Sequence, residues 1–366
     1  MVGSRLSRRI VLATGLAATV PVVTGAVTSA QAAPPPPPGY ALPEVRLTAP
    51  LRQIPIPGGY NAGHTAFPGL VLRPDRTLTV AYRNAAAHLS LDGVVVVADS
   101  TDQGLTYGNY RVAAEASASH GTAAGGLRDP SLAYIGGELW VTYCVGPTAV
   151  NALGAYVKRG TRPAVRIDPG LPEASMCTPV VPLPDGSLGT AFYGKATGET
   201  RASCWFARST NGGTSWTSAR IVNGQALGND FPEPWLLVRG TKLIIMHRHG
   251  GWSNVGVTSS SDNGATWTPT QVAIVAATGR PTTLAMSTGK LLMVYRHPDT
   301  RSALMATSTD DGLTWKSTGT LLPSEGGPLG MTYAAMAEVL PGVVHVVVAS
   351  ERPNGSSVLH AGYLAG

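Results

Sequence analysis

Residues 260–267 read SSDNGATW, and the same eight-residue pattern recurs at three other places in the chain. The other copies are STDQGLTY (100–107), STNGGTSW (209–216) and STDDGLTW (308–315). The copies that begin at 209, 260 and 308 are 51 and 48 residues apart, whereas the first gap is 109 residues, which places a degenerate copy near residue 155. A period near 50 residues is typical of repeated supersecondary units that stack or radiate from an axis.

The chemistry of this pattern is that of a tight turn. A side-chain oxygen of Asp or Asn can accept backbone N–H bonds across the bend, and the glycine can adopt a positive φ. The terminal Trp or Tyr is placed to wedge between neighbouring sheets. We therefore assign these segments a structural role and no catalytic one.

The composition agrees with many short strands joined by turns. The 366 residues include 44 glycines and 29 prolines, and only 13% are charged. An apolar content of 43% argues against disorder, and outside the N-terminus no stretch is apolar enough to span a membrane. The formal net charge of +6 includes three arginines among the first nine residues, and the rest forms no basic stripe of the kind that binds nucleic acid.

The N-terminus has the features of an export signal. Arg8 and Arg9 form a twin-arginine pair ahead of a mildly apolar run, and Ala30-Gln31-Ala32 offers the small residues that a signal peptidase requires. We therefore predict a twin-arginine signal peptide at 1–33, a Pro-rich spacer at 34–40 and a folded domain at 41–366. This organisation predicts a secreted protein, which we expect to be a monomer.

Three cysteines, Cys144, Cys177 and Cys204, allow at most one disulfide. A Cys177–Cys204 bond is possible in an oxidising compartment, and three buried thiols are the alternative. The sequence has no metal-ligand spacing, so it predicts neither a metal nor another cofactor.

The octapeptide resembles the Asp box, S-x-D-x-G-x-T-W, and through it residues 60–360 resemble the sialidase (neuraminidase) superfamily of β-propellers. A second repeat supports this resemblance, because six segments begin alike, each expected to be the innermost strand of a blade. They read HTAFPGLVL, LRDPSLAYI, MCTPVVPLP, FPEPWLLV, GRPTTLAM and MTYAAMAEV. The resemblance implies an all-β fold, a six-bladed β-propeller of four-stranded antiparallel blades.

Five of these segments keep a 15-residue interval between the start of a strand and the end of the strand that returns, as from Glu233 to Arg248. An antiparallel hairpin brings these two ends together, and in a propeller the inner-strand starts converge on one mouth. We therefore expect eight residues to meet there: His64, Arg83, Asp129, Glu233, Arg248, Arg280, Arg296 and Tyr333.

Three of these residues, Arg83, Arg248 and Arg296, occupy equivalent positions, which predicts a clamp for a carboxylate or another anion. Rim arginines paired with local acids are the alternative. The resemblance implies an arginine triad, of which Arg248 and Arg296 match the second and third members. The first member is missing, because the family's R-I-P motif reads AFP at 66–68, and Arg83 or Arg280 is the candidate to replace it.

The resemblance also implies catalytic groups. Tyr333 in MTYAAM matches the nucleophilic tyrosine, and Glu233 in FPEP matches the glutamate that activates it. Asp92 in LSLDGVVVV lies in the loop of the acid/base aspartate, and Asp129 in RDPS matches a segment that shapes the sugar pocket. A tyrosine avoids the repulsion that a carboxylate nucleophile would meet beside an acidic sugar. A packed tyrosine and a turn-capping aspartate are the alternatives.

Two histidines near the expected mouth, His64 and His88, have no counterpart in the sialidase pattern. In a polysaccharide lyase, arginine or histidine neutralises a uronate carboxylate while Tyr or His abstracts the C5 proton. Three hypotheses therefore stand. The first is a secreted exo-glycoside hydrolase of sialidase type that cleaves a terminal acidic sugar from an oligosaccharide or polysaccharide. The others are a lyase acting on a uronate-containing glycan and a non-catalytic glycan-binding propeller.

Overall fold

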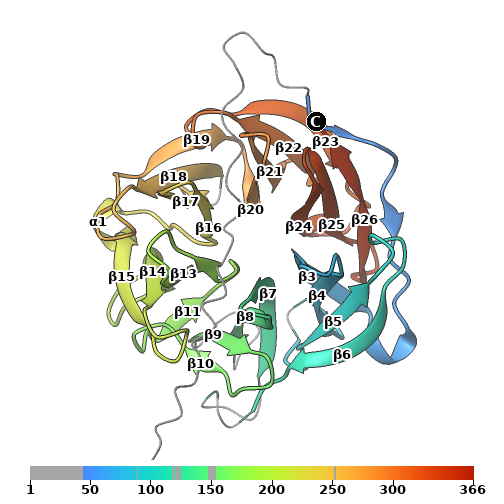
Figure 1. The fold of residues 1–366 in the computed structure, drawn as a ribbon, viewed down its shortest axis with the longest axis horizontal. Coiled ribbons are helices and arrows are strands. Elements are labelled where there is room, and N and C mark those ends of the chain that lie inside the picture. The colour runs from blue at the N-terminus through green and yellow to red at the C-terminus, as the bar shows by residue number, and fades with distance from the viewer. Residues whose placement is uncertain (1–43, 89, 118–119, 121–124, 147–153, 251–252) are drawn as a thin grey trace, which may run out of the picture.

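The computed structural model describes residues 44–366, except 89, 118–119, 121–124, 147–153 and 251–252. The predicted signal peptide and spacer, residues 1–40, lie outside the described residues. The described part is all-β, and its 26 strands form sheets that are arranged around a central axis as in a propeller (Figure 1). Its two helical segments are a single turn each: η1 (Gly58–Tyr60) and α1 (Gly224–Leu227).

Four separate sheets of four or five antiparallel strands form blades of their own. The first holds β7 (Gly126–Ile135), β8 (Glu138–Gly146), β9 (Gly154–Arg159) and β10 (Val165–Arg166). The second holds β11 (Glu173–Ser175), β12 (Val181–Pro182), β13 (Leu188–Lys195), β14 (Ser203–Ser209) and β15 (Thr217–Val222). The third holds β16 (Trp235–Arg239), β17 (Lys242–His249), β18 (Asn254–Ser260) and β19 (Gln271–Val275). The fourth holds β20 (Thr278–Ala285), β21 (Leu291–Arg296), β22 (Ala303–Ser308) and β23 (Lys316–Leu322).

The remaining strands form one nine-stranded sheet, so the prediction of six separate blades is wrong. This sheet joins the two ends of the folded chain. It holds β1 (Arg46–Leu47), β2 (Arg52–Gln53), β3 (His64–Leu72), β4 (Leu78–Ala85), β5 (Val94–Ser100), β6 (Gly108–Ala114), β24 (Met331–Leu340), β25 (Val343–Glu351) and β26 (Ser357–Ala365). Two of the six predicted inner-strand segments, at the starts of β3 and β24, therefore belong to one continuous sheet.

The seam of this sheet lies between β26 and β3, which pair in parallel at Ser357 and His64. The Ser357 amide donates to the carbonyl of Gly63 (3.1 Å), and the Thr65 hydroxyl donates to the carbonyl of Ser357 (2.8 Å). The short strands β1 and β2 pair with the same edge of β26. The ring is thus closed by backbone pairing between its first and last strands, which a count of sequence repeats does not reveal.

The four octapeptides form hydrogen-bonded turns of one design. In the copy at 260–267, Asp262 Oδ1 accepts from the Thr266 amide (2.9 Å), and the Ser260 hydroxyl accepts from the Gly264 amide (2.8 Å). The Trp267 ring lies 5.3 Å from the ring of Phe206 on the neighbouring sheet. The predicted turn chemistry and the wedging aromatic are both present. Among the described residues the structure has no octapeptide turn near residue 155, which lies within β9; the turn at the equivalent place, 160–164 between β9 and β10, is shorter.

All three cysteines are buried and free, so the alternative of buried thiols describes the structure. Within the part of the chain that is described, no helix has the length and hydrophobicity to cross a membrane.

Candidate active site at the propeller mouth

The innermost strands carry backbone irregularities where they enter the mouth. Phe67 and Asp129 lie in breaks of the strand register, and Glu233 lies two residues before the start of β16. All three precede a proline and adopt positive φ, at 56°, 54° and 54°. This backbone conformation costs roughly 1–3 kcal/mol for a residue other than glycine and is concentrated at functional sites. Three sheets therefore hold the equivalent residue in the same strained state.

The centre of the mouth is a contact between Tyr333 of β24 and Glu233. The Tyr333 hydroxyl donates a short hydrogen bond to Glu233 Oε1. The other carboxylate oxygen, Oε2, accepts from Arg248 Nη1 at 3.2 Å, and Arg248 Nη2 donates to Thr278 Oγ1 at 2.9 Å. Glu233 and Arg248 are both buried. The structure thus brings together three of the predicted residues as one chain of hydrogen bonds.

The surroundings of the Tyr333 phenol make its ionised form less favourable than it is in water. Burial, together with the negative charges of Glu233 and Asp129, raises the pKa of Tyr333 well above its ordinary value, and Arg248 and Arg296 oppose this shift. A neutral phenol is a weak nucleophile and needs a base within hydrogen-bond reach. Glu233 stands in that position. The pair therefore has the geometry of a nucleophile and its activating base.

Another predicted ligand, Arg280, lies beneath this centre and contacts protein rather than the mouth. It is 1% exposed. Its guanidinium donates to the carbonyls of Pro68 (2.9 Å), Ala334 (2.7 Å) and Cys177 (3.2 Å), and Nε donates to Thr282 Oγ1 (3.1 Å). Four hydrogen bonds leave little donor capacity for a substrate. Arg280 ties the inner strands together at the axis, which corrects its predicted role as a substrate ligand.

The guanidinium of Arg83 likewise donates its hydrogen bonds to main-chain carbonyls. Arg83 is fully buried, and Nε donates to the carbonyl of Leu127 (3.0 Å). Its Nη1 and Nη2 donate to the carbonyls of Ala87 (2.8 Å) and Ser90 (2.7 Å). Burial, together with the charge of Arg128, lowers the pKa of Arg83 to about 10. Arg83 therefore fixes the segment that follows β4 against β7, and this geometry does not fit the predicted clamp.

The third equivalent arginine, Arg296, differs from Arg83 because its side chain remains partly exposed. Its Nη1 donates to the carbonyl of Leu329 at 2.9 Å. Burial lowers the pKa of Arg296, and the neighbouring Tyr333 raises it. Of the three equivalent arginines, Arg248 and Arg296 thus border the Tyr333–Glu233 centre, and Arg83 supports it from the side.

The carboxyl group of Asp129 has a pKa close to neutrality. Burial, reinforced by the charge of Glu233, raises the pKa of Asp129 to about 6, against the opposing charges of Arg128, Arg280 and Arg83. A carboxyl group with a pKa near 6 can both donate and accept a proton near neutrality. The sequence indicated only a pocket-shaping role for Asp129, so this property was missed.

Asp92, the predicted proton donor, is exposed and caps its own loop. Its Oδ2 accepts a hydrogen bond from the Ala86 amide at 3.0 Å. Partial burial pushes the pKa of Asp92 upward, but hydrogen bonds from Ser90 and Ala86 outweigh this, so the pKa is lowered. A lowered pKa does not suit a general acid. In this conformation Asp92 has the geometry of the turn-capping alternative.

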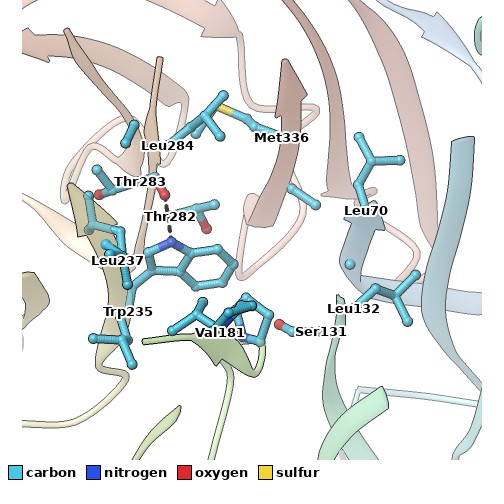
Figure 2. A pocket seen from close by; sticks show the side chains of 17 residues that line it. Leu70, Ser131, Leu132, Val181, Trp235, Leu237, Thr282, Thr283, Leu284 and Met336 are labelled. Carbon is cyan, nitrogen blue, oxygen red and sulfur yellow. Dashed lines mark hydrogen bonds between the residues drawn. The ribbon is translucent and has the colours of Figure 1, made fainter. Parts of the chain in front are cut away.

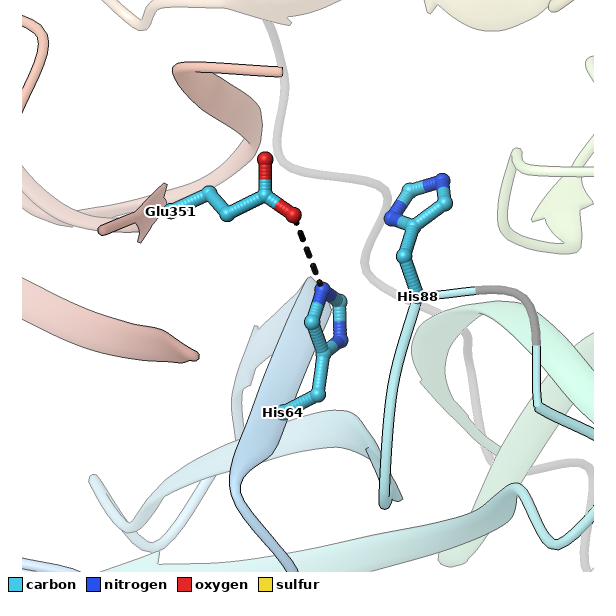
Figure 3. A group of neighbouring side chains, drawn as sticks. All are labelled: His64, His88 and Glu351. Atoms are coloured by element: carbon cyan, nitrogen blue, oxygen red, sulfur yellow. Dashed lines mark ion pairs between the residues drawn. The ribbon is translucent and has the colours of Figure 1, made fainter. Parts of the chain in front are cut away.

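The two predicted histidines lie together with an acid that the sequence did not indicate. His64, His88 and Glu351 each offer a ligand atom, and these atoms all lie within 4.8 Å of one another (Figure 3). His64 Nε2 is 3.8 Å from Glu351 Oε1. Burial, together with Arg83, lowers the pKa of His64 to about 4, and burial lowers that of His88 to about 3. Both imidazoles are therefore neutral at physiological pH.

Sequence reasoning missed two further residues of the mouth, Arg128 and Tyr193. Arg128 precedes Asp129 and acts electrostatically on Arg83, His88 and Asp129. Burial raises the pKa of Tyr193 well above its ordinary value, and the charges of Glu233 and Asp129 add to the shift. The available signal for Tyr193 was its place at the end of the 15-residue interval in the third repeat.

A separate cavity of about 340 Å³ lies further along the inner strands (Figure 2). Its lining is largely apolar, with Leu70, Leu132, Trp235 and Met336 from four different strands. The Trp235 indole donates to the carbonyl of Thr283 at 2.6 Å, and the Arg280 guanidinium lies over the Trp235 ring at 5.0 Å. None of the predicted site residues lines this cavity.

Comparison with known proteins agrees with this architecture. A model of the BNR repeat-like domain matches residues 168–346. No curated protein sequence matches the chain significantly. A protein of unknown function from Dyadobacter fermentans is 17% identical with a TM-score of 0.73, covering 88% of this chain and 100% of that one.

Two solved glycosidases share the fold. A Trypanosoma rangeli sialidase in complex with sialic acid is 13% identical with a TM-score of 0.66, covering 88% of this chain but only 59% of the sialidase. A Penicillium chrysogenum α-L-arabinanase complexed with arabinobiose is 15% identical with a TM-score of 0.62, covering 87% of this chain and 98% of that one. The predicted resemblance to sialidase-like BNR β-propellers is confirmed. At these identities the likeness shows the fold, and the activity has to be argued from the site.

Proposed function

We propose that the protein is an exo-acting glycoside hydrolase of sialidase type that cleaves a terminal acidic sugar from a glycan. The observation that carries this proposal is the hydrogen bond from Tyr333 to Glu233, with Arg248 on the opposite carboxylate oxygen. A glycan-binding propeller has no need of a half-buried phenol held against a carboxylate. The proposal includes secretion through the signal peptide of residues 1–33 and action as a monomer.

The proposed reaction proceeds in two displacements. The Tyr333 oxygen attacks the anomeric carbon while its proton passes to Glu233, and the bond from that carbon to the leaving oxygen breaks. A carboxylic acid protonates the leaving oxygen. Water, activated by the carboxylate formed, then attacks the anomeric carbon and releases the tyrosine, which recovers its proton from Glu233. Configuration at the anomeric carbon is retained overall.

We assign the acid/base role to Asp129 in preference to Asp92. The support is electrostatic: the pKa of Asp129 is raised to about 6, whereas that of Asp92 is lowered. Asp92 remains the competing assignment, because catalytic contacts can tighten only when substrate is bound. Replacing each residue by asparagine separates the two assignments.

The preference for an acidic sugar rests on Arg248 and Arg296, the two predicted clamp residues that border the centre. Arg128 stands close enough to shift the pKa of Asp129 and adds positive charge to the same mouth. Guanidinium groups recognise carboxylates through paired hydrogen bonds. Arg83 and Arg280 take no part in this proposal, because both are fully buried and donate to main-chain carbonyls. Arg248, by contrast, contacts Glu233 of the proposed catalytic pair.

A second candidate function is a lyase acting on a uronate-containing glycan. The observation in its favour is that His88 is neutral at physiological pH and borders Phe67, whose ring lies 5.3 Å from that of His88 and 5.3 Å from that of Tyr333. A neutral imidazole at this distance from the centre can act as the base of an elimination.

Product analysis of the purified protein tests these functions together. Sialosides, uronic-acid glycans and arabinans form the substrate panel, the last because an arabinanase shares the fold. A saturated reducing sugar released from an acidic glycan supports the hydrolase, and an unsaturated, ultraviolet-absorbing product supports the lyase. Release from arabinans alone contradicts the acidic-sugar assignment. Binding without any product supports the glycan-binding propeller.

A further inference from the structure

The group of His64, His88 and Glu351 is not explained by the proposed reaction. His64 is fully buried and Glu351 is 3% exposed. The buried nitrogens His64 Nδ1, His64 Nε2 and His88 Nδ1 have no hydrogen-bond partner among the described residues. Buried polar side-chain atoms nearly always have such a partner, so each exception calls for an explanation. Three nitrogens of two adjacent rings form one such exception.

No contact among His64, His88 and Glu351 supplies the missing hydrogen bonds of these nitrogens. The distance of 3.8 Å between His64 Nε2 and Glu351 Oε1 is too long for a hydrogen bond. The two imidazole rings pack edge to face, with centroids 5.2 Å apart. Glu351 is oriented by its second oxygen, because Oε2 accepts from the Leu329 amide at 2.6 Å. Oε1 therefore remains directed toward His64, as Figure 3 shows.

We propose that His64, His88 and Glu351 bind a borderline first-row divalent metal ion, for which Zn²⁺ is the reference. Two neutral imidazoles and one carboxylate form a common donor set for catalytic zinc and for non-haem iron. Metal–ligand bonds of about 2.0–2.2 Å bring donor atoms to roughly 3.3 Å from one another. The ligand atoms, now within 4.8 Å, reach this geometry through small side-chain movements.

The surroundings select the class of ion. Ca²⁺ and Mg²⁺ prefer oxygen ligands, and Ca²⁺ takes six to eight of them. This group offers a single carboxylate, and Arg83, Arg128 and Arg296 all act electrostatically on His88. Such positive surroundings oppose an ion held by charge alone, so binding has to come from the imidazole lone pairs. Imidazole ligands suit zinc, copper, iron and nickel.

The position of the three residues means that a bound ion would also stabilise the fold. His64 begins β3, Glu351 ends β25, and both pair with Ser357 at the seam of the nine-stranded sheet. His88 comes from the segment that Arg83 holds. A bound ion therefore links three chain segments where the ring closes. Since it binds the folded state, it stabilises that state in proportion to the logarithm of its concentration above Kd.

Calorimetric titration of the full folded chain with Zn²⁺, after treatment with a chelator, tests the proposal. We expect one equivalent to bind and to raise the midpoint of thermal unfolding. His88→Ala and Glu351→Gln should each weaken binding by more than the roughly 10–100-fold that loss of a supporting contact costs. His297→Asn, which changes a histidine outside the group, is the matched control and should bind as the unchanged protein does.

Binding of Zn²⁺ with equal affinity by both variants, or no stoichiometric binding by the unchanged protein, would overturn the proposal. Co²⁺ supplies a second measurement that does not depend on any variant folding. Bound to the unchanged chain, it should give the visible absorption of a site with four or five ligands, and Zn²⁺ should displace it. A spectrum identical to that of the hydrated ion contradicts the site. None of these readouts depends on glycosidase activity.

Discussion

The hydroxyl of Tyr333 donates a hydrogen bond to Glu233 although the two residues lie 100 positions apart in the chain. The contact joins β24 to the segment that enters β16, so it exists only when the nine-stranded sheet and the third blade have assembled. It places a phenol whose pKa is raised by burial against a carboxylate that can receive its proton. Catalysis and completion of the fold thus depend on the same geometry.

Tyr333→Phe should abolish turnover while the protein stays folded. The change removes the attacking oxygen and keeps the ring that packs against Phe67. Loss of a nucleophile lowers kcat by about 10³-fold or more. Steady-state kinetics together with circular dichroism measure both properties. Turnover within tenfold of the unchanged enzyme would remove Tyr333 from the reaction.

The Asp129 carboxyl should set the alkaline limb of the pH profile. A general acid works only when protonated, so with a pKa of about 6 the value of kcat/KM should fall as pH rises through 6. Asp129→Asn should remove this limb and slow substrates with poor leaving groups more than aryl glycosides. Asp92→Asn should change neither property. The reverse pattern would return the acid role to Asp92.

Among the arginines of the mouth, some should bind substrate and others should stabilise the fold. Arg296→Ala should weaken the binding of an acidic substrate by about 1.5–3 kcal/mol, the range for a lost charge-assisted hydrogen bond. Binding of the carboxyl-reduced analogue should be affected much less. Arg280→Met should instead lower the free energy of unfolding, because three main-chain carbonyls around the axis lose their donor. Affinity for both substrates and denaturant midpoints distinguish these outcomes. Equal losses on both substrates would make Arg296 a support as well.

Two glycines with the same backbone angle should respond differently to alanine. Gly264 and Gly289 both have φ of +88°, but a Cβ at Gly264 would lie 2.5 Å from Phe206, whereas Gly289 has open space. Gly289→Ala measures the cost of positive φ alone, about 1 kcal/mol. Gly264→Ala adds the clash with the neighbouring sheet and should cost more in urea unfolding. Equal costs would mean that the octapeptide turn makes no tight contact there.

Acid should destabilise the protein below neutrality. Burial lowers the pKa of His64, His247 and His345 to about 4 and that of His88 to about 3. Between these values and 6.5 the unfolded chain binds more protons than the folded one, so stability is lost as pH falls. Asp129, with a raised pKa, acts in the opposite direction between about 4 and 6.

Urea midpoints measured at pH 4.5 and pH 7 check this expectation. His88→Gln should reduce the difference between the two midpoints, because one group that titrates only in the unfolded chain is removed. A midpoint that does not change with pH would contradict the burial of these imidazoles in neutral form.

Local signals carried most of the correct sequence prediction. The octapeptide specifies its own turn through Asp262 and Gly264, so it identified the propeller class without knowledge of distant contacts. The 15-residue interval likewise placed Glu233 and Arg248 together, because a hairpin closes on itself. Side-chain direction could not be predicted in this way. Arg280 turns toward carbonyls of other sheets, and Arg83 turns toward Leu127 of β7 as well as toward its own following segment. The residue types do not indicate these directions.

Properties that depend on the whole assembly were also beyond the sequence. Burial by several strands raises the pKa of Asp129, whereas local hydrogen bonds lower that of Asp92. The role of proton donor, expected for Asp92 from the sequence, therefore passes to Asp129 in the proposal. The metal-ligand group escaped detection because Glu351 and His64 meet only across the seam.

The same seam has a consequence for how the chain can be rearranged. Arg46 pairs with Ala365, so the first and last described strands end side by side. A short linker between these ends, with a new opening in an exposed turn such as 240–241, should give a circular permutant with the same fold. In such a permutant only the linker and the short segment with β1, β2 and η1 separate β26 from β3, so the two strands no longer have to pair across the whole length of the chain. Folding should therefore be faster than in the natural order, while the mouth is unchanged.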